Sequence, residues 1–236
     1  VLHTWSEEDL SYYRDTMGDI IHASHQTGLT VYVNSWAVGR VFGGEANSEL
    51  VAKHPGSCQI LSTGEAMPAV CPNHPAFQTY MDGWIDAVCQ ADADTIFWDE
   101  PHFYFRKGRN GEWACRCNVC RALFRDRFGA DMPTENVPEV KIFRQERLLG
   151  LLSRWTARVA SHGKRNNICL LPDIFDAGLP DWESVAALPH LDELSSDPYW
   201  FDDDPEAKVV ADYTLYAKRL VDLCAVRGIE PQMWMK

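Results

Sequence analysis

The sequence has no long apolar run, no basic leader and relatively few positive charges. No segment approaches the roughly 20 consecutive apolar residues that a transmembrane helix needs, and no basic stretch followed by an apolar one opens the chain as in a signal peptide. We therefore expect no membrane span and favour a cytoplasmic location. The 22 Lys and Arg residues against 34 Asp and Glu give a formal net charge of −12. This charge argues against nucleic acid and membrane as partners, because both attract basic surfaces.

Other signatures are missing as well. The glycine-rich turn G-x-G-x-x-G, with which an open nucleotide-binding sheet usually begins, does not occur. Eight cysteines in 236 residues are too sparse for a disulfide framework. What remains is an ordinary globular composition, 46% hydrophobic and 24% charged, with enough length for one large domain. Nine Trp, eight Tyr and ten Phe residues are expected mostly in the core, but aromatic faces also stack on sugar rings.

Helices and strands alternate along the chain. Hydrophobic spacing, capping residues and glycine or proline breaks predict helices at residues 6–26, 76–90, 118–128, 138–161 and 205–226, and a short one after Pro180. Apolar runs predict strands within residues 29–36, 94–100, 167–173, 191–200 and 229–235. This alternation is typical of an α/β protein with a parallel sheet and helices outside it.

Polar and aromatic residues stand at the end of nearly every predicted strand. The strand ends read HTW, NSW, WDEPH, LPD, SDPYW and MWM. Because the chemistry of a (β/α)8 TIM barrel gathers at the C-terminal ends of its strands, this decoration favours a barrel over an open doubly wound sheet. We expect one barrel domain over residues 1–236. The chain opens with VLHTW and closes with IEPQMWMK, so we expect a piece of a longer protein whose first and last barrel strands are missing.

Three closely spaced cysteines give the strongest local signal. The C-x-C-x-x-C spacing of Cys115, Cys117 and Cys120 suits tetrahedral thiolate ligation of Zn²⁺. A fourth thiolate would close the site and make it structural, and Cys58 and Cys71 are the upstream candidates. Reduced free thiols are the alternative interpretation. The remaining cysteines lie in apolar helix or strand patterns and are expected in the core: Cys89, Cys169 and Cys224.

Two adjacent carboxylates, Asp99 and Glu100, follow the predicted strand that contains Trp98. A carboxyl beside Trp98 at the end of a buried strand would have a raised pKa, which a general acid needs to protonate a glycosidic oxygen near neutral pH. Asp99 would hydrogen-bond a sugar hydroxyl or orient Glu100. The structural alternative is a helix cap or a loop salt bridge with Arg106.

Glycoside hydrolysis normally needs a second carboxylate. Asp173 and Asp197 both follow predicted strands, and Asp197 is the better candidate because Tyr199 and Trp200 follow it. A turn-forming Asp before Pro is the alternative interpretation of Asp197. Glu230 lies at the wrong end of its strand. The residues expected to line a sugar pocket are His3, Trp5, Trp36, Trp98, His102, Tyr199 and Trp234.

The acid after the fourth strand, followed by C-x-C-x-x-C-x-x-x-F, resembles the glycoside hydrolase family 42 β-galactosidases and their relatives. The stretch AVCPNHPAF is similar to that family's segment before helix three and supplies Cys71. The similarity covers roughly residues 1–130. Asp99 departs from it, because the family has Asn before the catalytic Glu.

The resemblance implies a (β/α)8 barrel with Glu100 as acid/base and a structural zinc on four cysteines, with Cys71 favoured over Cys58 as the fourth ligand. The family's nucleophile is a Glu at the end of strand seven, and no such Glu follows the strand at residues 229–235 within this chain.

Three classes of function are therefore open. The first, which we favour, is a hydrolase that cleaves O-glycosidic bonds of a carbohydrate substrate with Glu100 as general acid/base. The second is a metal-dependent hydrolase or lyase with Asp99, Glu100 and His102 as ligands, because the sequence D-E-x-H brings oxygen and nitrogen donors together. The third is a barrel that binds sugar without cleaving it.

Overall fold

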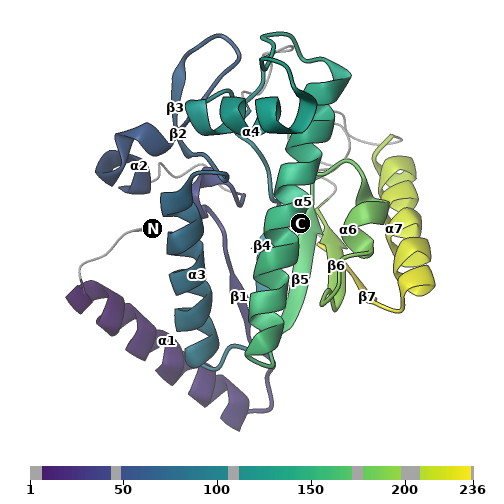
Figure 1. Cartoon of the computed structure of the whole chain (residues 1–236). Helices are drawn as coiled ribbons and strands as arrows, with labels where there is room; N and C mark the ends of the chain where they lie inside the picture. The colour runs from purple at the N-terminus through teal and green to yellow at the C-terminus, as the bar shows by residue number, and fades with distance from the viewer. Residues whose placement is uncertain (1–6, 44–48, 106–111, 172–177, 198–207, 235–236) are drawn as a thin grey trace.

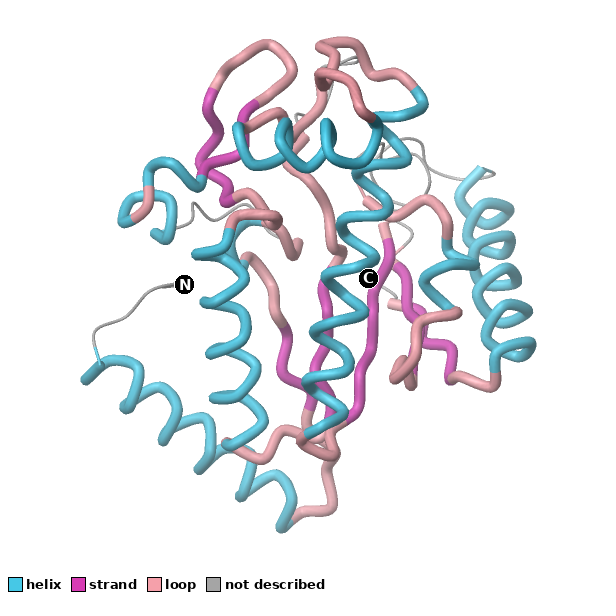
Figure 2. Tube along the Cα trace, in the orientation of Figure 1, coloured by secondary structure: helices cyan, strands magenta, loops and turns pink. Residues whose placement is uncertain are grey.

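The computed structural model describes residues 7–43, 49–105, 112–171, 178–197 and 208–234. These residues form an α/β fold (Figures 1 and 2). The helices are α1 (Glu7–Gln26), α2 (Glu49–Lys53), α3 (Pro75–Gln90), α4 (Asn118–Phe128), α5 (Pro138–Ser161), α6 (Trp182–Ala186) and α7 (Lys208–Arg227), with 3₁₀ turns η1 (Val38–Arg40) and η2 (Pro55–Ser57). The strands are β1 (Tyr32–Asn34), β2 (Cys58–Ile60), β3 (Ala66–Val70), β4 (Thr95–Asp99), β5 (Arg165–Leu170), β6 (Glu193–Ser196) and β7 (Glu230–Met233).

The main sheet has five parallel strands in the order β1-β4-β5-β6-β7. This spatial order follows the chain without a reversal, whereas a doubly wound sheet reverses at a switch point. The predicted parallel α/β architecture is therefore confirmed. Within the described residues the sheet is not closed into a ring. Strands β2 and β3 form a separate antiparallel hairpin that sequence patterns did not predict.

Local signals set the helix ends where the sequence predicted them. Helix α3 has Pro75 in its first turn, and the His74 side chain accepts a hydrogen bond from the Ala76 N–H at 3.2 Å. Helix α4 ends at Gly129, whose φ of 69° is left-handed and whose N–H donates to the Arg125 carbonyl. The predicted bounds of α4 and α5 match the structure.

One face of the sheet is apolar and covered by helices. Figure 1 shows α3 and α5 side by side over β1, β4 and β5, with α6 and α7 next to β6 and β7. Trp98 of β4 stacks on Trp155 of α5, with ring centroids 6.0 Å apart and an interplanar angle of 14°. Both rings are fully buried. Full burial of a large apolar side chain stabilises by about 1.5–3 kcal/mol, so this layer is a main source of stability.

The opposite face of the sheet, which we call the concave face, is largely polar. Strand pairing places these residues on it: Tyr32, Thr95, Phe97, Asn167, Cys169, Glu193, Ser195 and Gln232. The Tyr32 hydroxyl donates to both carboxylate oxygens of Glu193 at 2.9 and 3.0 Å. The amide of Asn167 donates to Glu193 at 2.9 Å and to Gln232 at 2.6 Å.

Two contacts show that this face is curved inward. Tyr32 on β1 reaches Glu193 on β6, and Phe97 on β4 packs edge-on against Trp234 after β7, with ring centroids 5.2 Å apart. Each pair lies three strands apart, about 14 Å in a flat sheet with a spacing of about 4.8 Å. Because side chains stand roughly perpendicular to a sheet, such contacts require the sheet to curl around them.

No helix in the described ranges is both long enough and apolar enough to cross a membrane.

Candidate functional site

The carboxyl ends of the parallel strands lie at one edge of the sheet. Asn34 ends β1 and Asp99 ends β4, while Asp197 and Trp234 directly follow β6 and β7. The pairing of Asp99 with Cys169 and of Ser196 with Met233 keeps these ends level. The structure therefore brings Trp36, Asp99, Glu100, Asp197 and Trp234 to the same edge, as the strand-end pattern predicted.

Asp99 is held by the loop that follows β1. The Asn34 amide donates to Asp99 Oδ2 at 3.2 Å, and the Asp99 N–H donates to the Ser35 hydroxyl at 3.2 Å. The same Asn34 accepts from the Trp36 N–H at 2.7 Å. A Cβ on Gly43 would lie 3.0 Å from Asp99 Oδ2 and 3.2 Å from the Trp36 ring. Only glycine at this position lets the carboxylate and the half-exposed indole lie side by side.

Glu100 has an unusual backbone conformation at the turn out of β4. Its φ of 46° is left-handed, and its N–H donates to the Cys169 carbonyl at 3.0 Å. A non-glycine residue in this region costs of order 1–3 kcal/mol, and such residues cluster at functional sites. Glu100 is 6% exposed, so its carboxyl is nearly enclosed by protein.

The buried thiol of Cys169 feels the charges of three carboxylates. Burial raises the pKa of Cys169 well above its ordinary value, and the negative charges of Glu100, Asp99 and Asp197 raise it further. These carboxylates come from the ends of β4 and β6, on either side of β5. The three carboxylates thus concentrate negative charge at the carboxyl edge of the sheet, and the Cys169 thiol among them stays protonated and unreactive.

His102 supports the loop that carries Glu100, rather than lining a sugar pocket as predicted. It is 7% exposed, and its Nδ1 donates to the Glu100 carbonyl at 2.6 Å. Burial lowers the pKa of His102 to about 4, and the charges of Arg40 and Arg144 act in the same direction. The imidazole is therefore neutral at neutral pH and braces the left-handed turn.

Trp98 does not belong to the pocket, which corrects the prediction from sequence. Adjacent strand residues point to opposite faces, so Trp98 faces the helices while the Asp99 side chain faces the other way. Its indole N–H donates to Asn166 at 3.0 Å within the core. Trp36 and Trp234 are each 45% exposed, which leaves their ring surfaces accessible at the edge.

Several predicted site residues lie outside the described part of the chain. They are His3, Trp5, Asp173, Tyr199 and Trp200, together with Arg106. Sequence patterns in turn missed the roles of Asn34, Ser35 and Gly43 around Asp99. Asn34 and Ser35 belong to the strand end NSW, from which only Trp36 was assigned a site role, whereas no local pattern marks Gly43.

Four buried cysteines form a compact cluster beside the hairpin. The Sγ atoms of Cys71, Cys115, Cys117 and Cys120 all lie within 4.8 Å of one another. Two of the separations are 3.5 Å, between Cys71 and Cys120, and 3.6 Å, between Cys117 and Cys71. A tetrahedron of sulfurs at about 2.3 Å from a zinc ion has edges of about 3.8 Å, so the four thiols fit a tetrahedral metal.

The ionisation of these thiols favours a cation among them. Burial raises the pKa of Cys71, while hydrogen bonds from the neighbouring thiols lower the pKa of Cys117. A dry pocket that supports one thiolate among four sulfurs is suited to a divalent ion that neutralises several. Cys58, the other predicted candidate, lies nearby but outside the group. The prediction of Cys71 as the fourth member of the cluster is confirmed.

Among the described residues, this cluster is the one group of three or more His, Cys, Asp or Glu side chains whose ligand atoms converge. Asp99, Glu100 and His102 do not form a second group of this kind.

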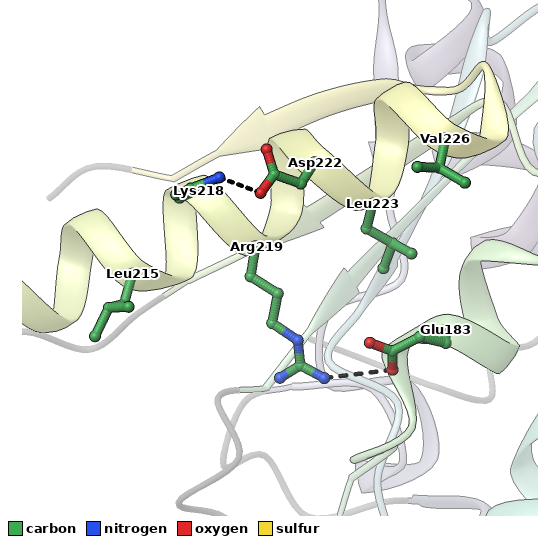
Figure 3. Close-up of a pocket in the computed structure, with 7 residues that line it drawn as sticks. All are labelled: Glu183, Leu215, Lys218, Arg219, Asp222, Leu223 and Val226. Atoms are coloured by element: carbon green, nitrogen blue, oxygen red, sulfur yellow. Dashed lines mark hydrogen bonds and ion pairs between the residues drawn. The ribbon is translucent and has the colours of Figure 1, made fainter.

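A shallow groove lies away from the strand ends, on the outer helices (Figure 3). It has a volume of about 430 Å³, and Leu215, Leu223 and Val226 of α7 line it. An ion pair of 3.5 Å between Arg219 and Glu183 crosses from α7 to α6 at its border. None of the predicted site residues lines this groove.

No family model matches the sequence, and no curated protein matches it significantly.

Proposed function

We propose that the protein is a glycoside hydrolase in which Glu100 acts as the general acid/base on an O-glycosidic bond. The observation that carries this proposal is the placement of Glu100. Its carboxyl is nearly enclosed, its backbone is strained, and two further carboxylates, Asp99 and Asp197, lie at the same carboxyl edge of the sheet, where all three raise the pKa of Cys169. A pair of carboxylates across a pocket is the usual machinery for this reaction.

The sheet supports this proposal as part of a (β/α)8 barrel. Its strands follow one another in chain order, and side chains from β1 and β6 meet across the concave face. Both features are typical of a sheet that closes on itself. In such barrels the catalytic groups come from the ends of several different strands.

Asp197 is the second carboxylate of the described site. If it activates a water molecule, the carboxyls of Glu100 and Asp197 should lie about 6.5–9.5 Å apart and the reaction should invert the anomeric centre. A nucleophile at about 5–5.5 Å from Glu100 would instead give retention. Trp36 and Trp234, both half-exposed, would stack on the sugar, while Asp99 would accept a hydrogen bond from one of its hydroxyls.

The test compares Glu100→Gln with the unmodified protein on natural disaccharides and on activated aryl glycosides. General acid catalysis is worth about 10²–10⁴-fold, so turnover of the natural substrates should fall by that order. The loss should be smaller for aryl glycosides, whose leaving groups depart without protonation.

Glu183→Gln is the matched control, because Glu183 is an exposed carboxylate on α6. It should retain full turnover. If the Glu100→Gln protein cleaves natural glycosides as fast as the unmodified protein, Glu100 is not the general acid/base.

We further propose that the cysteine cluster holds a structural zinc ion. Four thiolates with no open position suit a structural site, and soft sulfur ligands favour zinc or an iron–sulfur cluster. Metal analysis should find one zinc per chain in the unmodified protein and in Cys58→Ser. Cys71→Ser should lose most of it. Equal zinc content in the two variants would contradict this ligand set.

A further inference from the structure

Asn73 connects the cysteine cluster to helix α5. It lies two residues after Cys71 and is 3% exposed. Its side-chain nitrogen donates to Cys120 Sγ at 3.3 Å, and its side-chain oxygen accepts from Arg147 Nε at 2.9 Å. Gln78 of α3 donates to the Asn73 backbone carbonyl at 3.3 Å, which fixes the position of this residue.

The arginine determines which way the Asn73 amide points. A guanidinium carries only donors, so the amide oxygen must face Arg147. The amide nitrogen then faces Cys120, where it has a sulfur as its acceptor. Arg147 therefore holds Asn73 in the orientation that donates to the cluster.

The charge of Arg147 has the sign that a four-thiolate centre needs. Four thiolates around a divalent ion leave a net charge of about −2 in a buried site. A hydrogen bond to a thiolate withdraws negative charge from sulfur. A cation that contacts the hydrogen-bond donor, as Arg147 contacts Asn73, offsets a further part of the negative charge. A second N–H, from the backbone of Ile60, lies 3.5 Å from Cys115 Sγ.

We propose that Asn73 and Arg147 are the outer-sphere residues of the metal site. Asn73 stabilises metal-bound Cys120 by a hydrogen bond, and Arg147 both orients the Asn73 amide and offsets the charge of the centre. This inference rests on the proposed metal ion. Asn73 and Arg147 would orient the thiolate ligands and lower their negative charge without contacting the metal themselves.

The experiment measures the affinity of the intact chain for Zn²⁺ by competition with a chromophoric chelator, and records the sulfur-to-metal charge-transfer bands after loading with Co²⁺. Outer-sphere substitutions typically weaken metal binding by about 10–100-fold. Asn73→Asp replaces the donor with an acceptor at constant size, so it should show this loss and shifted Co²⁺ bands. Arg147→Met should weaken binding in the same way, and Arg147→Lys, which keeps the charge, should recover part of the affinity.

Arg158→Met is the matched control, because Arg158 lies on the same helix and pairs with Asp86, not with Asn73, Gln78 or the cluster. It should bind Zn²⁺ like the unmodified protein. Arg147 is only half-buried, so its variants keep the test informative if Asn73→Asp does not fold. Asn73→Asp and Arg147→Met proteins with unchanged affinity and unchanged bands would overturn the outer-sphere role alone. An unmodified protein that binds neither metal would overturn the metal site and this inference together.

Discussion

His102 shows how a single buried side chain shapes the candidate site. Its Nδ1–H is committed to the Glu100 carbonyl, so it holds the strained turn rather than contacting a substrate. The group is enclosed, and two arginine charges oppose its protonation. A proton on this imidazole would have to be accommodated in the core.

We therefore expect His102 to make stability depend on pH. Its pKa is lowered from 6.5 to about 4, so between these values the unfolded chain binds a proton that the folded chain does not. The contribution of His102 to the free energy of unfolding should be complete above about pH 6.5. The free energy of unfolding should then fall by about 2–3 kcal/mol as the pH decreases towards 4. Denaturant unfolding of the unmodified protein and of His102→Asn, which keeps a donor near the Nδ1 position, measures this contribution as the difference between the two pH profiles.

The exposed His54, replaced by Asn, serves as the control. Carboxylates that titrate in the same range are present in all three proteins, so their effects cancel. Parallel profiles for the unmodified protein and His102→Asn would show that His102 is not the cause.

At the scale of elements, the hairpin and α4 form a unit around the cysteine cluster. Leu61 pairs with Ala114, and the Arg116 N–H donates to the Ile60 carbonyl at 2.7 Å, so the segment before α4 runs along β2. The short strands β2 and β3 offer few hydrogen bonds of their own. A unit of this size depends on cross-links, which the thiolates and their metal would provide.

Removal of the proposed zinc ion should loosen this unit before the sheet. After treatment with a strong chelator, hydrogen exchange should accelerate at residues 58–71 and 112–128, while the amides of β4 and β5 stay protected. Protection should return when Zn²⁺ is added back. Unchanged exchange in the unit, or equal loss throughout the sheet, would contradict a local stabilising role.

At the scale of the whole molecule, the concave face joins strands that are far apart in the sheet. Glu193 is 3% exposed and is hydrogen-bonded by Tyr32 and Asn167, with Arg165 at 3.3 Å. A buried carboxylate is tolerated only when such partners satisfy it. The network thus stabilises the curled form of the sheet over a flat one.

Tyr32→Phe tests this curvature. Deletion of a hydrogen bond to a buried charged group should lower the free energy of unfolding by about 1–3 kcal/mol. A double-mutant cycle with Glu193→Gln should give a coupling energy of about 0.5–3 kcal/mol, because the two side chains are in contact. Tyr12→Phe, at an exposed position on α1, should have almost no effect. Additive effects of Tyr32→Phe and Glu193→Gln would mean that the two strands do not meet.

The sequence by itself determined six of the seven described helices, the parallel sheet and the cysteine cluster, but it did not predict the five-residue helix α2. Capping residues, apolar spacing and glycine stops act over a few residues, so α4 and α5 could be bounded from the chain alone. The close spacing of three cysteines already brings their thiols together. The strand-end pattern could place Asp99 and Glu100 at one edge because parallel strands share the direction of their ends.

Only the tertiary structure decided which partners these residues have. The bond between Tyr32 and Glu193 spans 161 residues of sequence, and the bond between Asn73 and Arg147 spans 74. Such contacts depend on how the sheet curls and how α5 packs, and no local pattern records either. Tertiary packing also decided that Trp98 lies on the face of the sheet that the helices cover. Alternation along a strand fixes that Trp98 and Asp99 point apart, but only the packing of the helices determines which of them is buried in the core.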